Sequence, residues 1–224
     1  MSIDIKKIST ESRLENSYNI DQMETIDVLR TINNEDKSVP YCVEEAISQL
    51  VPLVDSIKVA IENGGRLIYM GAGTSGRIGL LDAVECPPTY GVSDETIMCL
   101  LAGGKNAFSK AVEGAEDSKE LAVSDLKEIN LTKNDVVVGI TASGRTPYVI
   151  GGIEYAKEVG CITGCIVNAK SSVLASMVDY PVEAVTGSEV ISGSTRMKSG
   201  TAQKLVCNMI STSVMVKLGH VYHN

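Results

Sequence analysis

Three short segments rich in hydroxyl groups, glycine and fixed positive charge are the parts of this sequence that could do chemistry. They are residues 71–77 (GAGTSGR), 141–147 (TASGRTP) and 186–204 (TGSEVISGSTRMKSGTAQK). Each precedes a pattern typical of a helix, so hydroxyl groups and the free N–H groups of a helix N-terminus could be presented together. Such a combination binds anions. Three such segments in one chain predict a site for a phosphorylated small molecule.

The third segment carries the highest density of candidate ligands. It offers hydroxyl groups at Ser194, Thr195, Ser199 and Thr201, and positive charge at Arg196 and Lys198. Together with two arginines of the other segments, the candidate anion contacts are Arg77, Arg145, Ser194, Arg196 and Lys198. The same cations could instead form ion pairs at helix starts. The helix that follows this segment is expected to offer free N–H groups to a phosphate.

The first segment also matches the dinucleotide-binding fingerprint G-x-G-x-x-G, at Gly71, Gly73 and Gly76. That fingerprint expects an acidic residue about 20 positions further on, at the end of the second strand. Here the expected strand, 96–102, runs into Gly103 and Gly104 without a carboxylate. Thr74 and Ser75 add hydroxyl groups that a pyrophosphate loop does not require. A sugar phosphate is therefore the favoured ligand over a dinucleotide.

Composition excludes several classes of partner. The 224 residues are 44% hydrophobic and carry a net charge of −8 without a basic stripe, which argues against nucleic acid. Neither an apolar signal core nor a run of about 18 apolar residues is present, so a cytoplasmic protein without membrane contact is expected. The six cysteines lack zinc-site spacing, and both histidines lie in the last five residues. We expect reduced thiols, no metal and no cofactor.

The apolar pattern predicts an α/β protein with a doubly wound parallel sheet. We expect an N-terminal arm and helix over 1–37, the helix capped by Asp21, and a sugar-phosphate domain over 38–224. A long helix should start near Ser38 and bend at Pro52. Strands are expected at 66–71, 95–102, 135–141, 161–167 and 180–185. Helices are expected at 75–86, 105–113, 117–129, 146–159, 171–177 and 197–218.

In such a sheet, ligands bind outside the carboxyl ends of the strands, where the strand order reverses. The segments at 71–77 and 141–147 follow the first and third expected strands. They should therefore face one pocket, provided that these two strands are neighbours.

Five motifs in order resemble the N-acetylmuramic acid 6-phosphate etherases, within the wider SIS (sugar isomerase) family. The motifs are GAGTSGR, ECPPTYGV, AVEGAED, ASGRTPYVIG and GSTRMKSGTAQKLVCNMIST, and the resemblance runs from about Ser9 to Val221. It implies a flavodoxin-like five-stranded sheet, a homodimer, and cleavage of the D-lactyl ether of N-acetylmuramic acid 6-phosphate. By matching positions it assigns phosphate binding to Ser75, Thr141, Ser143 and Thr146, with Thr74 beside them. Members of this family continue past Asn224, so the chain is expected to be a truncated form.

The resemblance also implies two catalytic carboxylates, Glu85 and Glu116. An ether at C3 can be eliminated once ring opening places an aldehyde beside the C2 proton; a base removes that proton and an acid protonates the departing lactate oxygen. We expect Glu85 to be the acid and Glu116 the base, with Glu113 as the rival of Glu116. Pro87 and Pro88 should end the helix just past Glu85. Alternatively, Glu85 could be a solvated residue at a helix end, and Glu116 could favour the dipole of the following helix.

Ser75 and Glu85 lie ten residues apart on one expected helix, about 15 Å at the usual rise, which is more than a hexose spans from phosphate to C3. At least one site residue is therefore expected from a second subunit. Two other functions remain open: a regulatory protein that binds a sugar phosphate without catalysis, and an aldose–ketose isomerase, which would release no lactate.

Overall fold

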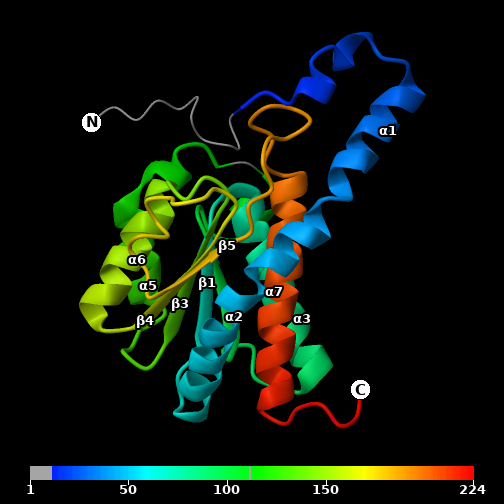
Figure 1. Ribbon diagram of the computed structural model, residues 1–224. Coiled ribbons are helices and arrows are strands. Elements are labelled where there is room, and N and C mark those ends of the chain that lie inside the picture. Colours follow the sequence, from blue (N-terminus) through cyan, green and yellow to red (C-terminus); the bar gives the residue numbers. More distant parts are fainter. Residues whose placement is uncertain (1–11, 111) are drawn as a thin grey trace.

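The computed structural model describes residues 12–110 and 112–224. Much of the predicted N-terminal arm and Ala111 of the AVEGAED motif therefore lie outside the described residues. The described chain is built on a five-stranded parallel sheet in the order β2-β1-β3-β4-β5, the flavodoxin-like order (Figure 1). The strands are β1 Leu67–Gly71, β2 Ile97–Leu101, β3 Val136–Thr141, β4 Ile162–Val167 and β5 Tyr180–Glu183. The predicted fold class is confirmed.

The central strands are covered on both faces, as their sequences indicated. Every residue of β1 and of β3 is buried, and the run Val136–Val138 lacks polar alternation because both of its faces are buried. β1 and β3 pair in parallel, with Leu67 opposite Val136. The condition for a shared pocket, that the first and third strands are neighbours, is met.

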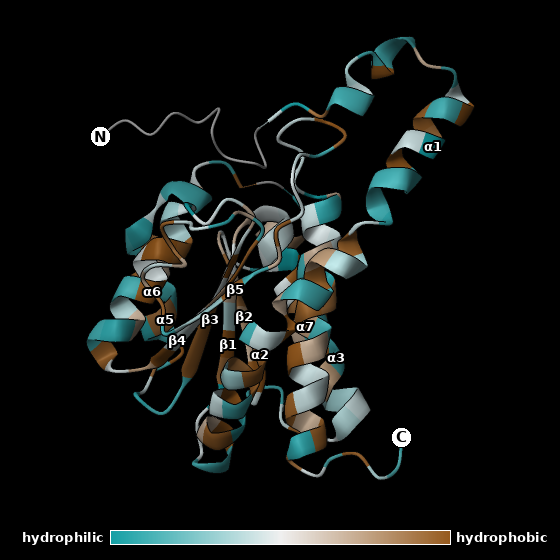
Figure 2. Cartoon of the chain, viewed as in Figure 1, coloured by the Kyte–Doolittle hydropathy of each residue, from teal (hydrophilic) through white to brown (hydrophobic). Residues whose placement is uncertain are grey.

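Helices cover the two faces of the sheet. The helices are α1 Thr25–Asp36, α2 Val39–Glu62, α3 Gly73–Tyr90, α4 Asn106–Ser109, α5 Lys119–Glu128, α6 Pro147–Val159 and α7 Lys198–Lys217, and the short 3-10 turns are η3 Glu15–Ser17, η4 Ile20–Gln22 and η5 Ala115–Asp117. One apolar core joins the sheet to α2, α3 and α7, and the other joins it to α5 and α6 (Figures 1 and 2).

The first helix differs from its prediction. α1 begins at Thr25 after Glu24, which makes no side-chain cap, whereas the predicted cap, Asp21, lies in the 3-10 turn η4. α1 buries none of its residues and extends away from the sheet (Figure 1). The division of the chain at residue 37 stays a prediction.

The prediction that Pro87 and Pro88 end the helix beyond Glu85 is wrong, because α3 continues to Tyr90. The two prolines remove hydrogen bonds only in its last turns, where Val84 and Glu85 are exposed. The helix instead ends at Gly91, which adopts the left-handed conformation and donates its N–H to the carbonyl of Pro87 at 2.9 Å.

Two other predicted helices are corrected. The helix expected at 105–113 is reduced to the four residues of α4. The helix expected at 171–177 is absent, because tertiary partners take its backbone groups: Leu174 donates its N–H to the carbonyl of Gly144, and Ser171 donates to the carboxylate of Glu183. Elsewhere the strands and the remaining helices follow the predicted order.

Along residues 12–110 and 112–224, none of the helices combines the length and apolarity that crossing a bilayer requires. The six cysteines are free thiols. Burial raises the pKa of Cys86 and of Cys161 to about 11, so both stay protonated near neutral pH and are poor nucleophiles.

Candidate active site

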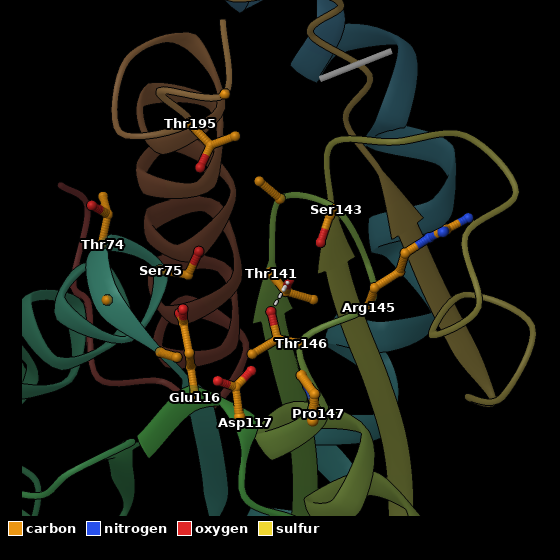
Figure 3. A pocket seen from close by; sticks show the side chains of 14 residues that line it. Thr74, Ser75, Glu116, Asp117, Thr141, Ser143, Arg145, Thr146, Pro147 and Thr195 are labelled. Carbon is orange, nitrogen blue, oxygen red and sulfur yellow. Dashed lines mark hydrogen bonds between the residues drawn. The ribbon is translucent and has the colours of Figure 1, made fainter. Parts of the chain in front are cut away.

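A pocket of about 340 Å³ opens at the carboxyl ends of β1 and β3 (Figure 3). It lies between the two loops that follow these strands, with the loop before α7 on its rim. Seven predicted site residues line it: Thr74, Ser75, Glu116, Thr141, Ser143, Arg145 and Thr146. The structure thus brings together residues that are up to 72 positions apart in the chain.

The first loop turns sharply enough to aim the start of α3 into this pocket. A Cβ atom on Gly76 would lie 2.5 Å from the carbonyl oxygen of Gly71, so only glycine allows the strand end and the first turn of the helix to approach so closely. Thr74 and Ser75 occupy that first turn. Their hydroxyl groups and the N–H groups of the first helical turn can therefore reach the same anion.

The second loop starts at Thr141, the last residue of β3, which is buried. The hydroxyl groups of Thr141 and Thr146 share a hydrogen bond of 2.8 Å, drawn as a dashed line in Figure 3. Gly144 takes a positive φ of 67°, and Pro147 opens α6 in the first helical position. Ser143, Arg145 and Thr146 thereby line one wall of the pocket.

The loop before α7 contributes Gly193 and Thr195 to the pocket, but Ser194, Arg196 and Lys198 do not line it. The ammonium group of Lys198 is 2.7 Å from a carboxylate oxygen of Glu35 on α1, and its side chain is 4% exposed. This is the ion pair that the sequence left open as the alternative to anion binding.

The N-terminus of α7 is also already occupied. The buried carboxylate of Glu189 accepts hydrogen bonds of 2.9 Å from the N–H groups of Lys198 and of Ser199. The expectation that these groups are free to bind a phosphate is wrong. Sequence reasoning missed this role of Glu189, since no local spacing rule links a residue to a helix that begins nine positions later.

Two carboxylates face the pocket from the turn η5. Glu116 and Asp117 line it, and the turn follows Gly114, whose φ of 76° allows the reversal of the backbone. Asp117 was not among the predicted site residues. A second cavity of about 190 Å³ shares Glu116 with the first and is also lined by Glu113 and Arg77. Glu113 lines only the second cavity, so of the two rival glutamates only Glu116 shares a pocket with the hydroxyl groups of the two loops.

Two further predicted residues, Glu85 and Arg77, lie outside the pocket. Glu85 is exposed on α3, ten residues beyond Ser75, and is not among the residues that line either cavity. Arg77 donates from Nε to the carbonyl of Phe108 at 3.0 Å and from Nη2 to the carbonyl of Ala107 at 2.8 Å. Its guanidinium group thereby holds α4 against the start of α3.

The pocket offers neutral donors more than charge. Arg145 is the one cation among the described residues that line it, whereas Glu116 and Asp117 contribute two carboxylates. A phosphate here must be held chiefly by hydroxyl groups and backbone N–H groups, as in other sites at helix N-termini.

Fold and pocket define the class of protein. Residues 117–213 match the model of the SIS domain, and residues 49–157 match that of the glucokinase regulatory protein N-terminal SIS domain. Among solved structures, the chain resembles a phosphoheptose isomerase from Francisella tularensis, with a TM-score of 0.63 and 15% identity over 86% of this chain and 98% of that one. This is an SIS fold.

Closer relatives give the particular family. The chain is 55% identical over 223 residues to the N-acetylmuramic acid 6-phosphate etherase of Clostridium botulinum, covering 100% of this chain and 74% of the relative. It is 53% identical to the protein of the same name from Clostridium beijerinckii, covering 73% of that relative. The chain belongs to the N-acetylmuramic acid 6-phosphate etherase family.

Proposed function

We propose that this chain cleaves the D-lactyl ether of N-acetylmuramic acid 6-phosphate, giving N-acetylglucosamine 6-phosphate and D-lactate, and is thus a carbon–oxygen lyase. The observation that carries the proposal is that Glu116 lines the same pocket as the hydroxyl groups of the two phosphate-binding loops. A base and a phosphate site in one cavity are what a reaction at the carbons of a sugar phosphate requires.

Binding of the C6 phosphate holds the substrate in position. We assign the C6 phosphate to Ser75 and Thr74 at the start of α3, and to Thr141, Ser143 and Thr146 after β3. Neutral donors can bind a dianion here because the first turns of α3 and α6 add the positive ends of two helix dipoles. With the phosphate held, the sugar carbons extend toward Glu116.

The reaction is an elimination followed by an addition. In the open-chain form, Glu116 takes the C2 proton, and the electron pair forms the C2–C3 double bond as the C3–O bond breaks. Glu85 gives a proton to the departing lactate oxygen. Water then adds its oxygen to C3, C2 recovers a proton, and both carboxyl groups return to their starting states. These steps need no change of oxidation state in the protein.

Glu85 reaches this pocket only from another copy of the chain. Because it is exposed and about 15 Å along α3 from Ser75, we propose that a homodimer brings the partner's α3 to the pocket. Near Glu85 on α3, the apolar residues Leu81 and Val84 are 52% and 53% exposed. Exposed apolar residues of this kind support a contact surface on α3 beside Glu85. A cytoplasmic location stays a prediction.

The test is release of D-lactate from N-acetylmuramic acid 6-phosphate by the purified protein. Glu116→Gln should lower kcat by about two to four orders of magnitude while the protein still binds the sugar phosphate. Glu120→Gln, on the exposed surface of α5, is the matched control. In deuterated water, the product should carry deuterium at C2. In oxygen-18 water, it should carry the label in the hydroxyl group at C3.

Binding without release of lactate by the wild-type protein would contradict the proposed activity and favour a regulatory protein that binds sugar phosphates. Conversion of an aldose phosphate to a ketose phosphate without lactate would favour an isomerase.

A further inference from the structure

Glu189 is a fully buried carboxylate whose two oxygens are both used. One accepts the N–H of Lys198 and the other accepts the N–H of Ser199, each at 2.9 Å. These are the first two residues of α7. A carboxylate at a helix N-terminus is stabilised by the helix dipole, and charge-assisted hydrogen bonds of this kind are among the stronger ones in proteins. Glu189 is therefore fastened to α7.

This attachment closes the chain between Glu189 and α7 into a loop, 190–197. Inside it, Ser194 donates its N–H to the carbonyl of Ile191 at 2.9 Å. At its far end, Gly200 donates its N–H to the carbonyl of Thr195, also at 2.9 Å. The loop is thus joined to the first turn of α7 by Glu189 at its start and by the carbonyl of Thr195 near its end.

The closed loop places Gly193 and Thr195 at the rim of the pocket. Its outer part, residues 191–193, is exposed, so packing against the rest of the chain does little to hold it. In Figure 3, Thr195 lies across the pocket from Glu116 and Asp117. Its position depends on the tie between Glu189 and α7.

We propose that Glu189 is a positioning residue for substrate binding, a role that rests on the proposed function. It acts through the loop and does not touch the substrate. It holds Thr195 at the rim, where the hydroxyl group can contact the sugar phosphate. By occupying the N-terminus of α7, it also keeps the substrate's phosphate between α3 and α6.

The role requires a carboxylate. Glutamine has the same shape, but its NH2 group would face one of the two N–H groups that Glu189 now accepts, and one hydrogen bond would be lost. The buried carboxylate has no alternative partner in nearby Lys198, because that ammonium group is paired with Glu35. Glu189→Gln should therefore loosen the loop without removing any atom that touches the substrate.

The experiment compares Glu189→Gln, Thr195→Ala and the double variant in the full chain. Hydrogen exchange at the amides of Lys198 and Ser199 should be slow in the wild-type protein and faster in Glu189→Gln, with the centre of α7 still protected. Calorimetric titration with N-acetylglucosamine 6-phosphate, the proposed product, which undergoes no net reaction in the absence of lactate, should show Kd raised about tenfold in each single variant. The double variant should be no weaker than the worse single variant, because both changes remove the same contact. Glu158→Gln, exposed on α6, is the control.

The outcomes separate two failures. If the wild-type protein does not bind the sugar phosphate, the proposed function fails, while the exchange measurement still decides whether Glu189 holds the loop. If the wild-type protein binds it but Glu189→Gln binds equally well, or the two single effects add in the double variant, the positioning role is overturned. Loss of protection throughout α7 would also overturn it, since Glu189 would then support the whole fold.

Discussion

Ser75 and Glu85 lie on the same helix, α3, but only Ser75 lines the pocket. Ser75 belongs to the first turn, where the N–H groups are free to bind an anion. Glu85 lies nearly three turns later on the exposed surface. If both residues act on one sugar, as we propose, they belong to different subunits. The same helix then serves one pocket with its start and the partner's pocket with its later turns.

This arrangement predicts complementation between inactive variants. Glu85→Gln and Glu116→Gln should each lose lactate release as homodimers. In a mixed dimer, one pocket combines the intact Glu116 of one chain with the intact Glu85 of the other, so random mixing should restore roughly a quarter of wild-type activity. The measurement is D-lactate release after co-refolding the two variants in equal amounts.

The control for this experiment is each variant refolded alone. If both carboxylates came from one chain, every mixed pocket would contain a substitution in that chain, and mixing would restore nothing.

The hydroxyl groups of the second loop should act on substrate affinity more than on turnover. Ser143→Ala removes one donor from the proposed phosphate site but leaves the hydrogen bond between Thr141 and Thr146 intact. We expect KM to rise about tenfold, the equivalent of one hydrogen bond to a charged group, with kcat changed little. Steady-state kinetics of lactate release measure both. Ser176→Ala, on the exposed surface, is the matched control, and a fall in kcat at constant KM would argue against phosphate binding by Ser143.

Two glycines near the pocket should respond to alanine in opposite ways. At Gly76 the new methyl group would meet the carbonyl oxygen of Gly71 at 2.5 Å, so the loop must shift and the free energy of unfolding should fall by about 2 kcal/mol. At Gly200, inside α7, the nearest atom is the Cγ2 of Thr74 at 3.4 Å, an ordinary contact. Gly200→Ala should stabilise the chain by about 0.5–1 kcal/mol through helix propensity. Urea unfolding of both variants tests the pair, and equal effects would contradict the packing argument.

The sequence alone predicted the strands and loops whose patterns depend only on neighbouring residues. The run Val136–Val138 predicted a strand buried on both faces, and glycine with hydroxyl groups after the strands predicted the loops around Ser75 and Ser143. The pairing of β1 with β3 could only be stated as a condition, since it joins residues such as Leu67 and Val136 that are far apart in the chain.

Two of three errors arose where tertiary partners override local preference, and the third arose where one local signal outweighs another. The segment 171–177 has a helical pattern, but Leu174 donates its N–H to Gly144 instead. α3 passes Pro87 because Gly91 provides a better end four residues later. At α7, Glu189 takes the N–H groups that the sequence offered to a phosphate. The corrections at 171–177 and at α7 depend on contacts that propensity and spacing do not encode, whereas the glycine that ends α3 is a local signal that outweighs the two prolines.

The ion pair between Arg66 and Asp135 predicts how stability depends on pH. Burial alone would raise the pKa of Asp135, but hydrogen bonds from Arg66 and from the N–H of Thr132 outweigh it and hold the pKa below its ordinary value. A lowered carboxyl pKa adds stability that is present above the unfolded-state pKa of about 4 and is lost as pH falls through the folded-state value. Asp135→Asn should therefore cost about 2 kcal/mol at pH 7 and progressively less toward pH 3.

The measurement is the free energy of unfolding by urea across this pH range. The matched control is Glu154→Gln, which breaks the exposed pair with Lys119, whose side chains are 45% and 46% exposed. That variant should cost less than about 0.5 kcal/mol at any pH, because water screens the pair. A cost of Asp135→Asn that stays constant from pH 7 to pH 3 would mean that the hydrogen-bond geometry, and not the charge of Asp135, joins the start of β1 to the start of β3.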